Sequence, residues 1–195
     1  MMAALGTVLG TEPDTSVVDS LRERRGHEFE VIRHRVPEPL PGRYHVMALL
    51  DVLEHISDDS GTMKWAARHL EPGGILVVAV PAFQFLWTEQ DDAAHHFRRY
   101  TKDRLVRLLP PSLSLEHVTY FNTLLFAPIL AARVIMQLIP RGNRPPRAHL
   151  GIPPEPFNWL FYQAFRLDRR LVKRQSSGVG VSILMVARRN SAPAQ

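Results

Sequence analysis

The stretch that decides the fold is YHVMALLDVLEHISDDSGTMKWAARHLEPGGILVVAVP, residues 44–81. It starts with a mostly apolar run of strand length at 44–50 and passes through an acidic turn. An amphipathic segment at 60–70 follows, and then an apolar run at 75–81. Nearly continuous apolar runs are typical of strands covered on both faces of a parallel sheet. The stretch therefore predicts strand, helix and strand, the repeating unit of an α/β fold.

The same alternation continues on both sides of this unit. Before it, the sequence predicts a strand at 7–11, a helix at 15–26 capped by Asp14 or Thr15, a half-buried strand at 28–35 and a proline-rich loop at 36–43. After it, the sequence predicts a helix at 102–109, a strand at 114–121, an apolar helix at 122–139, a Pro- and Arg-rich loop at 140–156, an amphipathic helix at 157–174 and a last strand at 180–189. We expect a single α/β domain over residues 1–195 with a helical insertion before the last strand.

Composition excludes several classes of site. The 195 residues contain no cysteine, which excludes disulfides, thiolate metal sites and a cysteine nucleophile. A hydrophobic content of 45% and a charged content of 22% are ordinary for a globular protein. The first residues lack the basic region and the full apolar core of a signal peptide, so we expect a cytoplasmic protein.

Charge divides the chain into two halves. Residues 1–97 hold 8 Lys and Arg against 15 Asp and Glu, whereas residues 98–195 hold 16 against 4. The basic half could face an anionic substrate, an anionic lipid surface or nucleic acid, or its arginines could simply be solvated. Its basic residues have no interleaved aromatic platform, so we expect no nucleic-acid partner.

Acidic residues follow two of the predicted strands. Asp51, Glu54 and His55 come directly after the strand at 44–50, and Glu12 ends the first predicted strand. Ligands of open parallel sheets bind beyond the carboxyl ends of the strands, where these side chains would lie. The alternatives are that Asp51 caps the next turn and that Glu12 is a carboxylate favoured by a helix N-terminus.

Five segments in order carry a resemblance: GTEPD, LLDVLEHISDD, LEPGGILVVAVPAFQFLW, DDAAHHFRRYT and YFNTLLFAP. Together they resemble the class I S-adenosylmethionine-dependent methyltransferases, in the bacterial branch with a D-x-x-x-x-H-x-R-R-Y-T segment. The resemblance spans essentially the whole chain. It implies a Rossmann-like sheet and S-adenosylmethionine as cofactor, with residues 1–97 as the cofactor half and residues 98–195 as the acceptor half.

The resemblance also implies roles for individual residues. Glu12 matches the acidic position that binds the ribose of the cofactor. Leu50 and Asp51 match the end of the fourth strand of the family, which lines the adenosine and methionine side of the pocket. Glu54 and His55 match the "EH" of the family, close behind that pocket. Carboxylates gathered there would suit a sulfonium cofactor.

One family feature is missing from the sequence. The family has a first strand followed by a glycine-rich turn that approaches the cofactor closely, and these 195 residues contain no such turn. We expect an N-terminally truncated sheet that binds the cofactor weakly or not at all. The alternatives are that another segment fills the gap, or that the strand ending at Thr11 pairs directly with the strand at 44–50.

The loop after the strand at 75–81 supplies candidates for the acceptor side. His96 matches the histidine of the family and is the predicted general base, because histidine exchanges protons near neutral pH. Arg98, Arg99 and Tyr100 are the predicted acceptor-binding residues. The alternative is a structural lid in which the arginines pair with acidic residues such as Asp91 or Asp92. We expect no metal, since His95 and His96 are adjacent and lack other well-spaced ligands.

The apolar segment 123–139 is short for a membrane span and carries Arg133 and Pro128. A buried core helix is the first prediction, and a helix in the membrane interface, aided by basic residues at 141–147 and 166–174, is the second. The predicted function is methyl transfer to a small-molecule or lipid-linked acceptor, with peripheral membrane contact in the second case. The alternative is a non-catalytic methyltransferase fold that acts through protein contacts.

Overall fold

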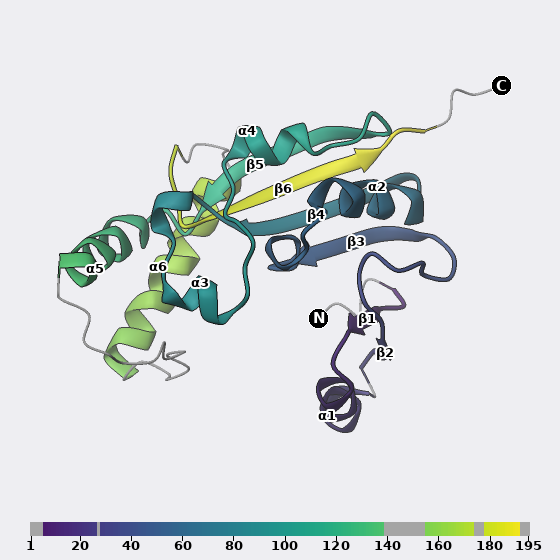
Figure 1. The fold of residues 1–195 in the computed structure, drawn as a ribbon, viewed down its shortest axis with the longest axis horizontal. Helices are drawn as coiled ribbons and strands as arrows, with labels where there is room; N and C mark the ends of the chain where they lie inside the picture. The colour runs from purple at the N-terminus through teal and green to yellow at the C-terminus, as the bar shows by residue number, and fades with distance from the viewer. Residues whose placement is uncertain (1–5, 27, 139–154, 174–177, 192–195) are drawn as a thin grey trace. The chain divides into compact units, whose positions relative to one another are not determined.

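The computed structural model describes residues 6–26, 28–138, 155–173 and 178–191, and within them the chain forms two compact units (Figure 1). The first unit ends at Pro41 and the second begins at Gly42. This boundary does not coincide with the change of charge near residue 97. The single domain expected over residues 1–195 stays a prediction, and each unit is described by itself.

The N-terminal unit is a small β-α-β arrangement. Strand β1 (Leu9–Glu12) pairs in parallel with β2 (Glu30–Arg33), and helix α1 (Thr15–Arg25) connects them. Asp14 caps α1 as predicted, because its side chain accepts a hydrogen bond from the backbone N–H of Ser16. Among the described residues of this unit, the buried apolar side chains are those of Val18 and Val31.

The C-terminal unit is built on the stretch 44–81. Strand β3 (Tyr44–Leu50) pairs in parallel with β4 (Leu70–Pro81), and helix α2 (Asp59–His69) between them packs against β4. Residues 71–74, which separate the predicted helix from the predicted strand at 75–81, lie within β4. Gly73 there has a φ of +77°, and the pairing register shifts between Tyr44 and Val46.

The sheet with its connecting helices confirms the predicted α/β fold, and its other half pairs antiparallel, which the strand–helix–strand alternation does not specify. Strand β6 (Ser182–Arg189) lies between β4 and β5 (Leu113–Phe121) and runs antiparallel to both, giving the order β3-β4-β6-β5 (Figure 1). One face of β4 and β6 forms the core. On it Leu76 pairs with Ala187, Val78 with Met185 and Val80 with Ile183, and all six residues are buried.

Strand β3 corrects a second expectation. Its apolar run predicts burial on both faces, but only Leu49 is buried, while Val46 is 58% and Leu50 is 48% exposed. The reason is its place in the sheet, because β3 is one of the two outer strands of the four. Direct pairing of the first strand with β3 is not among the pairs that the described residues form.

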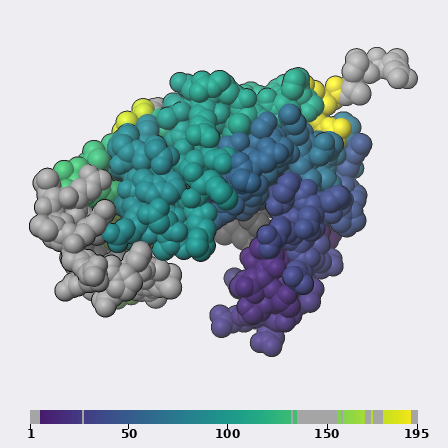
Figure 2. All heavy atoms as spheres, viewed as in Figure 1, coloured from purple at the N-terminus to yellow at the C-terminus, as the bar shows by residue number. Residues whose placement is uncertain are grey.

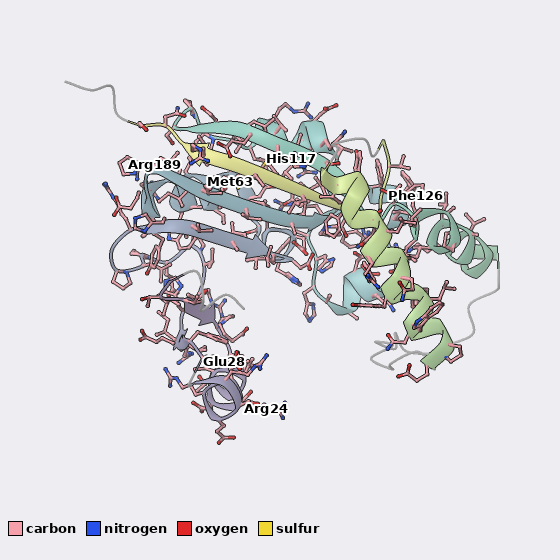
Figure 3. The ribbon with its side chains drawn as sticks, turned by 180° about the vertical axis from the view of Figure 1, so that it is seen from behind. Arg24, Glu28, Met63, His117, Phe126 and Arg189 are labelled. Atoms are coloured by element: carbon pink, nitrogen blue, oxygen red, sulfur yellow. The ribbon has the colours of Figure 1, made fainter. Side chains whose placement is uncertain are left out.

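The described part of the insertion before β6 contains two helices. Helix α5 (Phe126–Leu138) has no buried side chain among its described positions, so the prediction of a core helix is wrong for them. Helix α6 (Glu155–Lys173) lies across one end of the sheet when seen from behind (Figure 3). Asp168 ties α6 to the end of β5, since its carboxylate accepts from the backbone N–H groups of Asn122 and Thr123.

No described helix is both long enough and apolar enough to cross a membrane. The Pro- and Arg-rich loop predicted at 140–156 lies almost wholly outside the described residues.

Candidate functional site

The acidic turn after β3 is a short, partly buried segment. Asp51 has a φ of +51°, and its N–H donates to the carbonyl of Ala79, which continues the pairing of β3 with β4. A single 3-10 turn, η2 (Leu53–His55), follows. Within it Glu54 is only 1% exposed, whereas Asp51 and His55 are exposed, so the three do not share one face. Asp51 does not cap the turn that follows it, because the N-cap of η2 is Val52 and makes no side-chain cap bond. Helix α2 is capped by Asp58.

The carboxyl groups of this turn have raised pKa values. Burial raises the pKa of Glu54 to about 7, and the nearby charge of Asp51 adds to the effect. The neighbouring chain shields the carboxyl group of Asp51 from part of the solvent although the residue is exposed, and this desolvation raises its pKa, while His96 and His55 act against the shift. Glu54 Oε2 is buried and has no hydrogen-bond partner among the described residues.

The segment that follows β4 folds back onto this turn. It contains η3 (Gln84–Leu86), α3 (Glu89–Ala93) and a loop that ends at α4 (Lys102–Arg107). The N–H of Phe97 donates to the carbonyl of Glu54 at 2.8 Å. In the space-filling view, the blue part of the chain and the teal part that follows it in sequence lie directly against each other (Figure 2). Two predicted motifs about 40 residues apart therefore form one site.

Side chains fasten the loop at further points. Arg98 Nη1 lies 2.7 Å from Asp59 Oδ2, and its Nη2 donates to the carbonyl of Ser57. Tyr100 is fully buried, and its hydroxyl donates to Asp59 Oδ2 at 3.2 Å. Burial raises the pKa of Tyr100, and the charge of Asp59 adds to the effect, so the phenol stays protonated.

Asp91, His96 and Arg99 form a connected group. Asp91 Oδ1 lies 2.9 Å from His96 Nδ1, while Arg99 Nε and Nη2 donate to the two carboxylate oxygens of Asp91 at 2.8 and 3.0 Å. Asp91 is 1% and Arg99 is 7% exposed. Burial raises the pKa of Asp91, but hydrogen bonds from Arg99 and Thr88 outweigh it, so the pKa lies below its usual value. Asp91 is therefore an ionised, anchored carboxylate beside His96.

The structure brings some of the predicted site residues together and engages others in contacts within the chain. Glu54, His55 and His96 lie together, with one ligating atom of each within 4.8 Å of the others. Arg98, Arg99 and Tyr100 are engaged inside the chain, as the structural-lid alternative expects. Their contact with an acceptor stays a prediction.

The remaining predicted residues belong to the cofactor side. Leu50 and Asp51 are exposed at the tip of β3. Glu12 lies at the end of β1, and its Oε1 accepts from the N–H of Asp14, as the helix N-terminus alternative expects. Because each unit is described by itself, the meeting of Glu12 with Asp51 in one pocket stays a prediction.

Sequence reasoning missed Arg133, on α5. Its Nη1 is buried and has no hydrogen-bond partner among the described residues. Burial lowers the pKa of Arg133, and the charge of Arg99 lowers it further while that of Asp91 opposes the change. The guanidinium thus lies close to the Asp91 group. The signal in the sequence was a single charge within an apolar helix.

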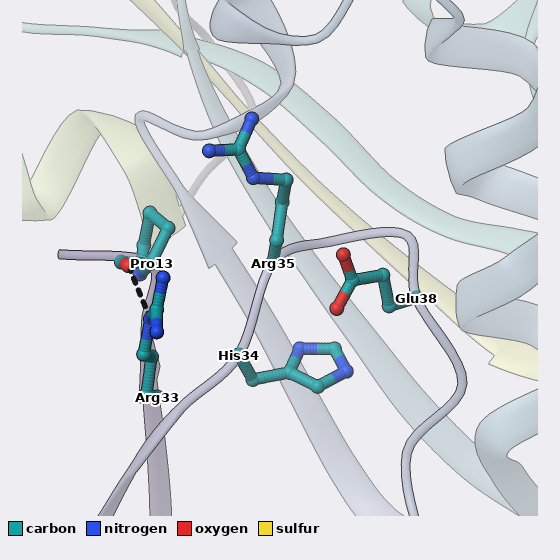
Figure 4. Close-up of a pocket in the computed structure, with 5 residues that line it drawn as sticks. All are labelled: Pro13, Arg33, His34, Arg35 and Glu38. Carbon is teal, nitrogen blue, oxygen red and sulfur yellow. Dashed lines mark hydrogen bonds between the residues drawn. The ribbon is translucent and has the colours of Figure 1, made fainter. Parts of the chain in front are cut away.

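The N-terminal unit has a pocket of its own. It is lined by Pro13, Arg33, His34, Arg35 and Glu38 (Figure 4). Arg33 Nε donates to the carbonyl of Pro13 at 3.4 Å, which closes one side. The pocket contains none of the predicted site residues.

Comparisons with known proteins identify a family for this chain and solved structures with a similar fold. Residues 4–129 match a family model described as "Methyltransferase domain". A putative methyltransferase from Bacillus halodurans is 16% identical, with a TM-score of 0.57, and the match covers 95% of this chain and 84% of that one. The complex of the Haloferax volcanii Trm112 methyltransferase activator with a putative methyltransferase gives 14% identity, a TM-score of 0.57 and coverages of 97% and 74%.

A third solved structure contains a ligand. The N-methyltransferase NodS from Bradyrhizobium japonicum, in complex with S-adenosyl-L-homocysteine, is 8% identical with a TM-score of 0.53, and the match covers 98% of this chain and 72% of that one. A search of curated proteins found no match. The family model spans more than half of the chain, so the protein belongs to the methyltransferase domain family, for which S-adenosylmethionine is the implied cofactor.

Proposed function

We propose that the chain transfers a methyl group from S-adenosylmethionine to a small-molecule or lipid-linked acceptor, with His96 as the general base. The observation that carries this proposal is the pairing of His96 with the anchored carboxylate of Asp91. A histidine whose Nδ1–H donates to a carboxylate keeps the lone pair of its Nε2, as in the dyads of hydrolases. Here Arg99 holds the Asp91 carboxylate in place, and the anchored carboxylate in turn orients the His96 ring.

The residues at the tip of β3 suit an adenosyl group. Leu50 offers an exposed apolar side chain and Asp51 an exposed carboxylate beside it. With Glu12 they would hold the cofactor, whose bound sulfonium supplies an activated methyl group. The glycine-rich turn is not in the sequence, so we expect this chain to bind the cofactor more weakly than a chain that has the turn.

The position of Arg133 favours the proposal that the acceptor carries a negative charge. Arg98 and Arg99 already pair with Asp59 and Asp91, whereas Arg133 Nη1 has no partner among the described residues. A half-buried guanidinium gains most from a carboxylate or phosphate, which satisfies its donors. We expect Arg133→Ala to raise KM for an anionic acceptor more than it lowers kcat.

The composition of helix α6 favours the proposal that the chain contacts a membrane surface and that its acceptor is lipid-linked. Its exposed apolar residues include Trp159, Leu160, Tyr162, Phe165 and Leu167. Its sequence also carries basic residues from Arg166 to Lys173. An amphipathic helix of this kind binds anionic lipid interfaces. Flotation with vesicles that contain anionic lipid tests this. Binding should weaken in Trp159→Ser/Phe165→Ser, and no flotation of the wild type would leave only the soluble small-molecule acceptor.

Calorimetry with S-adenosyl-L-homocysteine tests the cofactor assignment. It compares this chain with one extended at its N-terminus by a strand and a glycine-rich turn. We expect the extended chain to bind more tightly, and Asp51→Ala to weaken binding while Asp92→Ala does not, since Asp92 bonds Trp87 instead. Binding by neither chain would overturn the methyltransferase proposal in favour of a non-catalytic fold that acts through protein contacts.

The role of His96 needs a separate test. A methyl-transfer assay against phenolic, amine and lipid-linked acceptors should show turnover that His96→Ala lowers by about 10²–10⁴-fold, with S-adenosyl-L-homocysteine affinity unchanged. The matched control is His95→Ala, because His95 is adjacent and exposed. Equal turnover in wild type and His96→Ala would refute the base assignment.

A further inference from the structure

Three side chains of the site have the chemistry of a metal centre. Glu54 and His55 come from η2, and His96 comes from the loop after α3. One carboxylate oxygen and two imidazole nitrogens lie within 4.8 Å of one another. The rings of His55 and His96 meet edge to face with centroids 4.5 Å apart. The loop contact from Phe97 to the carbonyl of Glu54 holds the two segments together.

Glu54 provides an observation independent of this clustering. It is 1% exposed, and its Oε2 has no hydrogen-bond partner among the described residues. A buried polar atom without a partner is costly, and such atoms usually meet a protein group, water or an ion. One carboxylate oxygen of Glu54 lies within 4.8 Å of a ring nitrogen of each histidine, so a cation between the three side chains would give this carboxylate the partner that its Oε2 lacks.

His96 provides a second independent observation. Its Nδ1 faces Asp91, which Arg99 and Thr88 in turn hold by hydrogen bonds. Histidines that bind metals commonly donate their other ring N–H to a carboxylate, which fixes the tautomer and directs the free nitrogen at the ion. In this arrangement Nε2 of His96 is the nitrogen left to bind.

We propose that Glu54, His55 and His96 bind one divalent transition-metal ion such as Zn²⁺. One carboxylate and two imidazoles suit this class better than Mg²⁺ or Ca²⁺, which prefer oxygen ligands throughout. Two ligand atoms that each lie about 2.1 Å from one ion are no more than about 4.2 Å apart. Ligand atoms of the cluster that are as far apart as 4.8 Å must therefore move together by about half an ångström when an ion binds. Three protein ligands leave positions open for water or an acceptor oxygen.

Metal binding extends the chemistry of the site beyond the proposed methyl transfer and does not depend on it. When the ion is bound, His96 acts as a ligand rather than as a base. An acceptor hydroxyl on the ion loses its proton more readily, so deprotonation would need no histidine. The metal-free and metal-loaded chain would therefore use His96 in two different ways.

The test is calorimetric titration of the purified chain with Zn²⁺, without cofactor or acceptor. We expect one equivalent to bind, and His55→Ala, His96→Ala and Glu54→Gln each to weaken binding at least about tenfold. His95→Ala is the matched control and should bind as the wild type does, because His95 lies outside the cluster. Titration with Co²⁺ should give visible absorption that His96→Ala loses.

Folding of the variants is followed by circular dichroism, and the exposed His55 gives a variant that should fold in any case. Absence of stoichiometric Zn²⁺ binding by the wild type would overturn the proposal. Equal weakening by His95→Ala and His96→Ala would overturn it too. A chain that binds S-adenosyl-L-homocysteine but not Zn²⁺ would lose the metal site alone and keep the proposed methyltransferase function.

Discussion

The buried ion pair between Asp91 and Arg99 gives the sharpest prediction, because it anchors the loop that carries His96. Replacing Arg99 with Met removes the charge and keeps much of the length of the side chain. At 2.8 Å, with an effective dielectric constant of about 20, the attraction is about 6 kcal/mol before desolvation is counted. Desolvation offsets much of this. Breaking a buried pair by removing one partner costs about 3–5 kcal/mol, since the other charge stays buried.

The structure places Arg99→Met at the lower end of that range. Asp91 keeps its hydrogen bonds to His96 and to the N–H of Thr88, so its carboxylate retains partners. We expect a loss of about 3 kcal/mol in the free energy of unfolding, measured by urea denaturation. Asp91→Asn combined with Arg99→Met should lose less than the sum of the two single losses, because no unpaired charge remains.

The control for this prediction is Arg104→Met. The Arg104 side chain is 46% exposed and lies 3.7 Å from Asp59 Oδ2, so its removal should cost less than about 1 kcal/mol. If Arg99→Met cost no more than Arg104→Met, the view that this pair anchors the site would be refuted.

Three further predictions concern stability and use the same urea assay. Tyr100→Phe should cost about 1–2 kcal/mol, because its buried hydroxyl bonds Asp59; no measurable change would contradict that bond. Asp58→Ala should cost about 1 kcal/mol and Asp58→Ser much less, because the Asp58 side chain caps α2; equal losses would argue against the cap. Leu76→Ala should cost about 2–5 kcal/mol in the core of β4, whereas Leu115→Ala, at an exposed position, should cost far less, and the reverse order would contradict the assigned core.

Much of the local structure could be predicted from the sequence. The strand at 44–50 and the capped helix after Asp14 have the predicted bounds to within a residue. Apolar periodicity and helix caps depend on a few neighbouring residues, so they can be predicted from the local sequence. The family could be predicted for a related reason, since its segments are short and follow one another in a set order.

What the sequence did not reveal is which neighbour each residue would meet. Apolar residues at 44–50 predict a strand, but only the strand order shows that Val46 and Leu50 lie on an outer, exposed strand. The sequence also did not specify the direction of β6, because the long insertion before it allows either orientation.

At the candidate site, the sequence by itself determined which ionisable residues are available, in two short motifs. Only the tertiary structure decided their tasks. It turned Arg99 inward onto Asp91, buried Glu54 without a partner for its Oε2 among the described residues, and brought His55 against His96. The physical reason is that burial and pairing depend on contacts between segments about 40 residues apart, which no local pattern specifies.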